Sequence, residues 1–122
     1  MKVRATMVGL LVAGWVLPLG AGEKLTMRVS PEVSFAPAHL IVRTMIDSDK
    51  ANRAIEIIAE SSDFYRSSVI ELDGDRAPRT SEVEFRSLPG GQYDVSATLI
   101  DASGEPRAYE RRQVQVLAGG ER

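Results

Sequence analysis

Residues 82–104 read EVEFRSLPGGQYDVSATLIDASG, and this stretch decides the fold. Val83 and Phe85 alternate with charged residues, and Tyr93 begins a second run of alternating apolar and polar residues. Successive side chains of a β-strand point to opposite faces, so each run predicts a strand with one buried face. Residues 88–91 between them contain proline, which lacks a backbone donor, and glycine, which adopts backbone angles that other residues avoid. The stretch therefore predicts two strands joined by a tight turn.

Short runs of the same kind occupy most of the remaining chain. They predict further strands at residues 25–30, 39–46, 53–59, 64–72 and 108–117. Pro31 and Pro37 confine the first part of the chain to a sheet edge, where residues 33–35 resume pairing after a kink. Residues 53–59 also fit a helical stripe, but their β-branched content and their neighbours favour a strand. A count of about seven short strands separated by turns is typical of an all-β sandwich.

The 122-residue chain is long enough for one domain. Lys2 and Arg4 precede an apolar run at residues 5–17, and small residues follow it. A basic start, an apolar run of about 7–15 residues and a small-residue exit together form a secretory signal peptide. We expect residues 1–22 to be a cleaved signal peptide, with an uncleaved anchor as the alternative. Residues 23–117 are then the domain, and residues 118–122 a disordered tail.

The net charge and the absence of cysteine limit the kinds of partner and the cell compartment that we expect. Loss of Lys2 and Arg4 leaves thirteen basic against seventeen acidic residues, a net charge of −4. Nucleic acids and anionic membranes favour basic surfaces, so we expect neither as a partner after signal cleavage. The absence of cysteine excludes disulfides, thiolate metal sites and a lipid-modified N-terminal cysteine. The mature domain is therefore expected to be secreted or periplasmic.

The 88–91 corner, followed by Tyr93, Val95 and Ala97, resembles the end of an immunoglobulin-like or fibronectin type III-like domain. The resemblance implies that Tyr93 is a tyrosine-corner residue, whose hydroxyl bonds nearby backbone while its ring fills the core. The corner is shorter than in typical fibronectin type III domains, and the tryptophan of their second strand is missing. The resemblance implies a seven-stranded antiparallel immunoglobulin-like sandwich, in the manner of secreted bacterial modules, and no particular family.

Acidic turn residues are the candidates for a metal site. Alternate loops of such a sandwich lie at one end, which gathers the candidates Asp47, Asp49, Asp73, Asp75 and Asp101. Ca²⁺ takes about six to eight oxygen ligands, and carboxylates with loop carbonyls supply them. Aspartate is also a favoured turn residue, and Arg53, Arg76, Arg79 and Arg107 beside the same loops neutralise acids. A Ca²⁺ site and solvated turns with surface ion pairs both stay open, and no cofactor is expected.

Aromatic and aliphatic residues are the candidates for partner binding. Phe64, Tyr65 and Arg66 begin a strand, and aromatics beside arginine are common at binding surfaces. The alternative is that one aromatic enters the core while the other covers the rim of the sheet. Ile58 and Ile100 fall on the wetted side of their strands, and exposure of both on one face would make that face a partner surface.

Nothing in the sequence identifies catalytic chemistry. His39 is the only histidine, and it is expected at a strand end as a polar surface residue. No nucleophile elbow, phosphate loop, dinucleotide fingerprint or zinc spacing occurs.

The first and last strands carry features that protect sheet edges. The first is short and ends at Pro31, and the last contains charges at 110–112, so we expect a monomer. The Arg111–Arg112 pair also predicts a bulge, because Tyr109 and Val114 have opposite parity.

These observations predict a non-catalytic secreted or periplasmic β-sandwich. We expect it to act as a protein-binding or structural accessory module for an unidentified envelope or extracellular protein. One alternative is a Ca²⁺-stabilised adhesive module that uses the acidic loop end. A second alternative is a small enzyme or carbohydrate-binding accessory domain.

Overall fold

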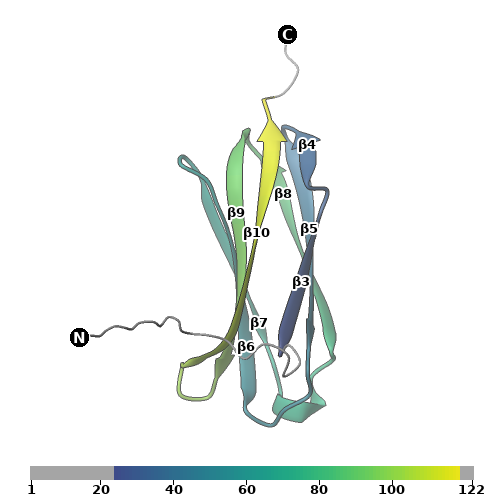
Figure 1. Ribbon diagram of the computed structural model, residues 1–122, viewed down its shortest axis with the longest axis vertical. Helices are drawn as coiled ribbons and strands as arrows, with labels where there is room; N and C mark the ends of the chain where they lie inside the picture. The colour runs from purple at the N-terminus through teal and green to yellow at the C-terminus, as the bar shows by residue number, and fades with distance from the viewer. Residues whose placement is uncertain (1–23, 119–122) are drawn as a thin grey trace, which may run out of the picture.

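The computed structural model describes residues 24–118, which fold into two packed β-sheets (Figure 1). The five-stranded sheet has the order β4–β10–β9–β6–β7, and the three-stranded sheet has the order β3–β5–β8. The strands are β3 (Leu25–Ser30), β4 (Val33–Phe35), β5 (Ala38–Ile46), β6 (Asn52–Glu60), β7 (Tyr65–Glu71), β8 (Thr80–Leu88), β9 (Gly91–Asp101) and β10 (Pro106–Leu117). A single turn of 3-10 helix, η1 (Gly74–Arg76), lies between β7 and β8.

The all-β sandwich is confirmed, but the strand count is eight rather than seven. Residues 33–35 form a strand of their own, β4, which pairs in parallel with the end of β10. The chain leaves the three-stranded sheet at Pro31 and joins the other sheet in the direction of β10, so the sandwich is not wholly antiparallel. Both β3 and β4 lie at sheet edges, as the prolines predict. The signal peptide predicted at 1–22 and the tail beyond Ala118 lie outside the described residues.

The core lies between the two sheets and follows the period-two pattern of the strands. β5 alternates strictly between buried and exposed positions along its length, and it is the central strand of its sheet. In β6, Ile55, Ile57 and Ala59 are buried, so the helical interpretation of this segment is wrong. A helix would have brought Ile58 to the same face, whereas the strand turns it to the outer side.

The corner before β9 has the expected geometry. Tyr93 is fully buried, and its hydroxyl donates a hydrogen bond of 2.7 Å to the Pro89 carbonyl oxygen. Phe64 packs against its ring edge-on, with 6.3 Å between the ring centroids. The tyrosine corner is therefore confirmed and anchors the turn between β8 and β9 in the core.

The bulge predicted at Arg111 and Arg112 is wrong. The register of β10 with β9 is continuous from Ala108 to Val116, and its only shift lies between Pro106 and Ala108. Tyr109 points to the outer face and is 58% exposed, so no change of parity is needed before Val114. Arg112 lies opposite the buried Val95, which places it on the inner face at the open margin of the sandwich.

Candidate functional site

Phe64, just before β7, and the first two residues of β7, Tyr65 and Arg66, do not form a single surface. Phe64 is half-buried against the core, and Tyr65 is exposed on the outer face of the five-stranded sheet. Arg66 lies over the Phe64 ring, with its guanidinium carbon 5.1 Å from the ring centroid. It also donates a 2.9 Å hydrogen bond to the Arg86 carbonyl oxygen, which bridges β7 to β8 of the other sheet. Of the three, only Tyr65 offers most of its side chain to a partner.

The outer face of the five-stranded sheet carries most of the exposed large apolar side chains. Each of them is more than half exposed, and the set is Val33, Phe35, Tyr65, Val69 and Tyr109. Ile58 and Ile100 lie on the same face, but both are half-buried. The cross-strand register shows why this face is mixed, because Thr98 and Glu56 stand between Tyr109 and Val69 in one row. We call this surface the five-strand face.

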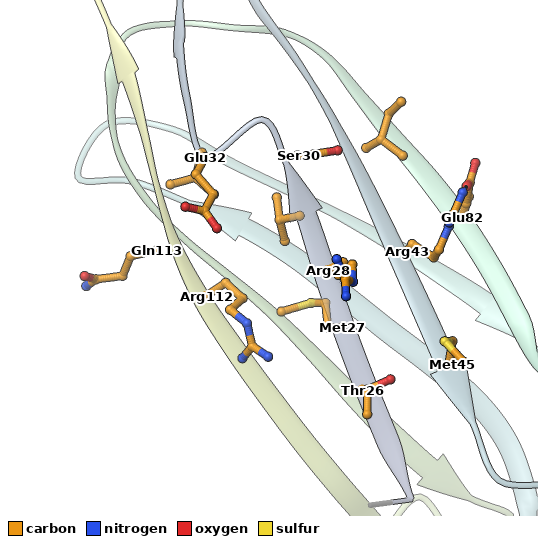
Figure 2. Close-up of a pocket in the computed structure, with 13 residues that line it drawn as sticks. Thr26, Met27, Arg28, Ser30, Glu32, Arg43, Met45, Glu82, Arg112 and Gln113 are labelled. Atoms are coloured by element: carbon orange, nitrogen blue, oxygen red, sulfur yellow. Dashed lines mark hydrogen bonds and ion pairs between the residues drawn. The ribbon is translucent and has the colours of Figure 1, made fainter.

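A groove opens between β3 and β10 at one margin of the sandwich (Figure 2). Its volume is about 1060 Å³, and Met27, Val29 and Val114 contribute apolar atoms to it. Figure 2 shows Arg112 on β10 at one side, and Arg28 and Arg43 on the strands of the other sheet.

The charges of this groove are largely paired. Arg28 and Arg43 are direct cross-strand neighbours, and Arg43 donates to the Glu82 carboxylate. Arg112 donates to the Glu110 carboxylate at 3.0 Å. Two like charges opposite each other on a sheet repel, but Arg28 is exposed to solvent, which screens this repulsion.

The loops that hold the candidate aspartates do meet at one end of the sandwich (Figure 1). The Ser48 hydroxyl donates to the Asp75 carbonyl oxygen at 3.1 Å, which joins the β5–β6 loop to the β7–β8 loop. Arg107 on β10 reaches the Asp49 carboxylate at 2.9 Å. The prediction that alternate loops share an end is therefore correct.

The carboxylates themselves serve their own turns. Asp49 accepts from the Ala51 N–H, and this bond together with Arg107 lowers the pKa of Asp49. Asp101 accepts from the Ser103 hydroxyl and N–H and from the Glu105 N–H, and these bonds lower its pKa below the ordinary 3.8. Across residues 24–118, no group of three or more His, Cys, Asp or Glu side chains is arranged to hold a metal ion.

A buried amide supports this loop end from inside. Asn52 is fully buried, and its amide nitrogen donates to the Asp47 carbonyl oxygen at 2.9 Å. The Oδ1 atom of Asn52 and the Nε atom of Arg107 are buried without a hydrogen-bond partner. Arg107 is paired with the Asp49 carboxylate, so these two atoms are the unsatisfied buried polar groups at this end of the described chain.

His39 lies on the exposed side of β5, near the opposite end of the sandwich. Its Nδ1 atom accepts from the Ser87 N–H at 3.3 Å. Ser87 has a positive φ of 60°, at the point where the β5–β8 register shifts. His39 thus accepts a hydrogen bond from a backbone N–H at an irregular point of β8, which is a structural role.

Neither the groove nor the position of Arg28 beside Arg43 was predicted from the sequence. The alternation of β3 and β5 places both arginines on a wetted face, yet only the register of the two strands makes them adjacent.

Within residues 24–118, no helix is long and apolar enough to cross a membrane.

Comparison with known proteins identifies the fold and nothing finer. No protein-family model and no curated protein sequence matches this chain. Among solved structures, a family 76 glycoside hydrolase from a bovine Bacteroides thetaiotaomicron strain has a TM-score of 0.57 at 15% identity. That match covers 75% of this chain but only 20% of the hydrolase, so the chain corresponds to a small part of that protein.

Two further structures match over most of their own length. A superoxide reductase (neelaredoxin) from Ignicoccus hospitalis has a TM-score of 0.56 at 12% identity, with 77% of this chain and 80% of that chain covered. The fibronectin(III)-like modules of Clostridium thermocellum CbhA have a TM-score of 0.55 at 13% identity, with 79% and 99% covered. At such low identities the likeness concerns the fold alone. The chain therefore has the fold of an immunoglobulin-like, fibronectin type III-like β-sandwich.

Proposed function

We propose that this chain is an extracytoplasmic, non-catalytic module that binds another protein through its five-strand face. The observation that supports the proposal is that Val33, Phe35, Tyr65, Val69 and Tyr109 are all exposed on the same face of one sheet. Water-exposed apolar and aromatic groups of this kind gain free energy when a partner covers them. The outer face of the three-stranded sheet offers only Ile41 and Met45 beside its charged residues.

Fold-level analogy agrees with an accessory role. The matched glycoside hydrolase contains this fold as a fifth of its chain, and the CbhA structures are modules. The fold also occurs in an enzyme of similar size, the superoxide reductase. The analogy alone therefore carries no function, and the exposed face is the stronger support.

The test compares two matched pairs of substitutions. A Phe35→Ser/Tyr109→Ser variant removes apolar groups from the five-strand face, and an Ile41→Ser/Met45→Ser variant does the same on the other sheet. Each tagged protein is incubated with the extracytoplasmic fraction of its native cells, and the bound proteins are quantified. We expect the first variant to lose a partner that the wild type and the second variant retain. Equal recovery with both variants would refute the assignment of this face.

Secretion is part of the proposal and has its own test. We propose that residues 1–22 direct export and are removed, which leaves a mature start near Glu23. N-terminal sequencing of the protein recovered from each cell fraction checks this. Recovery of the uncleaved chain from the cytoplasm would contradict it.

The Ca²⁺-stabilised adhesive module remains an alternative that a melting experiment decides. A ligand that binds only the folded state must raise its stability. Because Asp49 is paired with Arg107 and Asp101 with its own turn, we expect equal Tm values in excess Ca²⁺ and in chelator. A higher Tm in Ca²⁺, lost in an Asp101→Asn variant, would restore the alternative.

The remaining alternative, a small enzyme or carbohydrate-binding accessory domain, would use the β3–β10 groove. Its arginines suit an acidic sugar, since guanidinium groups bind carboxylates in pairs of hydrogen bonds. Arg43 and Arg112 would then exchange the carboxylates of Glu82 and Glu110 for that of the sugar. Binding of a glycan by the wild type, and its loss in an Arg112→Ala variant, would favour this reading over the main proposal.

A further inference from the structure

Strand β7 forms an open edge of the five-stranded sheet, and the hydrogen bonds beside it show which backbone groups are free. The Leu72 N–H donates to the Arg53 carbonyl oxygen at 2.9 Å, and the Ser61 N–H donates to the Phe64 carbonyl oxygen at 2.8 Å. The register between β6 and β7 is continuous between these two bonds. Hydrogen-bonded pairs alternate along an antiparallel ladder, so even-numbered residues of β7 bond to β6. The odd-numbered residues direct their N–H and carbonyl groups to the open edge.

The other sheet edges in the described part of the chain carry protective features. β3 has six residues and ends at Pro31, and β4 has three residues between two prolines. β10 carries the adjacent charges Glu110, Arg111 and Arg112 where β4 does not cover it. Charged side chains also follow the edge of β8, at Glu82, Glu84 and Arg86. Prolines, short strands and charges all discourage the addition of another strand.

β7 lacks these features along most of its length. It has seven residues without proline or glycine. The residues whose backbone faces the open edge are uncharged until Glu71, since they are Tyr65, Ser67 and Val69. Arg66 points to the inner side, where it is engaged by the Phe64 ring and the Arg86 carbonyl oxygen. In Figure 1 the tip of the β6–β7 hairpin stands at the upper left margin of the molecule, away from the other strands.

We infer that two copies of this chain pair through β7, antiparallel about a two-fold axis beside Ser67. In this register Tyr65 lies opposite the second copy's Val69, and symmetry repeats the pair. Each hydrogen-bonded pair exchanges both backbone bonds, so the free groups of Tyr65, Ser67 and Val69 are all satisfied. An aromatic side chain opposite a β-branched one is a favourable cross-strand pair.

The inner side of the same register is also complementary. Phe64 comes opposite the second copy's Ile70, and both residues already pack against the core of their own chain. A register centred on Ser68 would instead place Tyr65 opposite Glu71 and Arg66 opposite Ile70. That arrangement sets charged groups against apolar ones, so the Ser67 register is favoured.

A two-fold contact of this kind is closed. The same edge serves both copies, and the pairing leaves no free β7 to continue the assembly. The two five-stranded sheets join into one, and their five-strand faces become a continuous surface. The sequence predicted a monomer from the features of the first and last strands alone. Both of those strands stay at protected edges in this dimer. The inference does not depend on the binding of any other protein.

The first experiment measures sedimentation of the purified domain over a range of concentrations. We compare the wild type with Val69→Lys, and with Met45→Lys as the matched control, because the two native side chains are 57% and 52% exposed. We expect a concentration-dependent dimer for the wild type and Met45→Lys, and a monomer for Val69→Lys. A wild type that stays monomeric throughout, or a dimer that Val69→Lys leaves intact, would overturn the inference.

The second experiment tests the register in a chain that has no cysteine of its own. At a two-fold axis, Ser67→Cys places two thiols opposite each other, within the range of a disulfide. We expect Ser67→Cys to cross-link under mild oxidation much faster than Met45→Cys. Equal cross-linking rates would refute the register. The Phe35→Ser/Tyr109→Ser variant leaves β7 intact, so it should still dimerise even if it loses its partner protein.

Discussion

The Tyr93 hydroxyl donates its hydrogen bond to the Pro89 carbonyl oxygen, four residues earlier in the chain and 2.7 Å away. The same side chain is fully buried and receives the edge of the Phe64 ring. One residue thus ties the β8–β9 turn, the hydrophobic core and the start of β7 together. The corner supports the stability of the sandwich and lies apart from the outer surfaces to which we assign binding.

Removal of the Tyr93 hydroxyl should destabilise the domain without changing its fold. Tyr93→Phe deletes one hydrogen bond and keeps the ring, so we expect a loss of about 0.5–1.5 kcal/mol in the free energy of unfolding. Urea denaturation measures this loss. Tyr109→Phe is the control, because Tyr109 is exposed. If both variants unfolded at the same urea concentration, the corner bond would contribute nothing.

The raised pKa of Tyr93 predicts that the domain loses stability at alkaline pH. Burial raises the pKa of Tyr93 above its ordinary value of 10.0, so the folded state retains the proton at a pH where the unfolded chain loses it. Its contribution to stability is therefore full below pH 10.0 and declines as the pH rises above that value. Thermal melts across this range should show a steeper decline for the wild type than for Tyr93→Phe. Parallel curves would contradict the prediction.

Acid should weaken the β9–β10 hairpin through Asp101. Hydrogen bonds from Ser103 and Glu105 lower its pKa, so its contribution is present above the ordinary 3.8 and is lost as the pH falls through the lower folded-state value. Asp101→Asn keeps an oxygen acceptor for the turn but cannot be protonated in this way. We expect Tm to fall more for the wild type than for Asp101→Asn when the solution is acidified below pH 3.8. A larger fall for the variant would exclude Asp101 as the source.

Gly74 should resist substitution more than Gly104, although both have positive φ angles of 55° and 87°. A Cβ atom on Gly74 would lie 3.0 Å from the Lys50 carbonyl oxygen, whereas one on Gly104 meets nothing within 4 Å. Gly104→Ala pays only the backbone penalty of about 1–2 kcal/mol. Gly74→Ala adds the cost of moving two packed loops apart, so its urea midpoint should be the lower of the two. The reverse order would mean that the loops separate freely.

Strand positions were predictable because they depend on local pattern. The alternation around Tyr93 placed a strand and its buried face correctly, and residues 39–46 were correctly predicted as a strand. The count failed at residues 33–35, since three residues between prolines carry too little pattern to define a strand. The bulge predicted at Arg111 and Arg112 failed because it required Tyr109 and Val114 to share a face, whereas Tyr109 lies outside and Val114 is buried.

The candidate sites were less predictable, because each depends on which residues become neighbours. The loops of Asp49 and Asp101 were expected at one end, with a Ca²⁺ site and solvated turns with ion pairs both left open by the sequence. In the structure the Asp49 carboxylate pairs with Arg107, and the Asp101 carboxylate bonds its own turn. Ile58 and Ile100 were expected on a wetted side, and they share one face with Tyr65 in a half-buried state.

The sequence by itself determined the strands, their buried faces and the Tyr93 corner, because alternation and turn chemistry act over a few residues. Only the tertiary structure decided that β7 is an open edge, that Arg28 lies beside Arg43, and that Arg66 closes the margin toward β8. Register and strand order follow from the packing of whole sheets against one core, and residues distant in the chain contribute to that packing together.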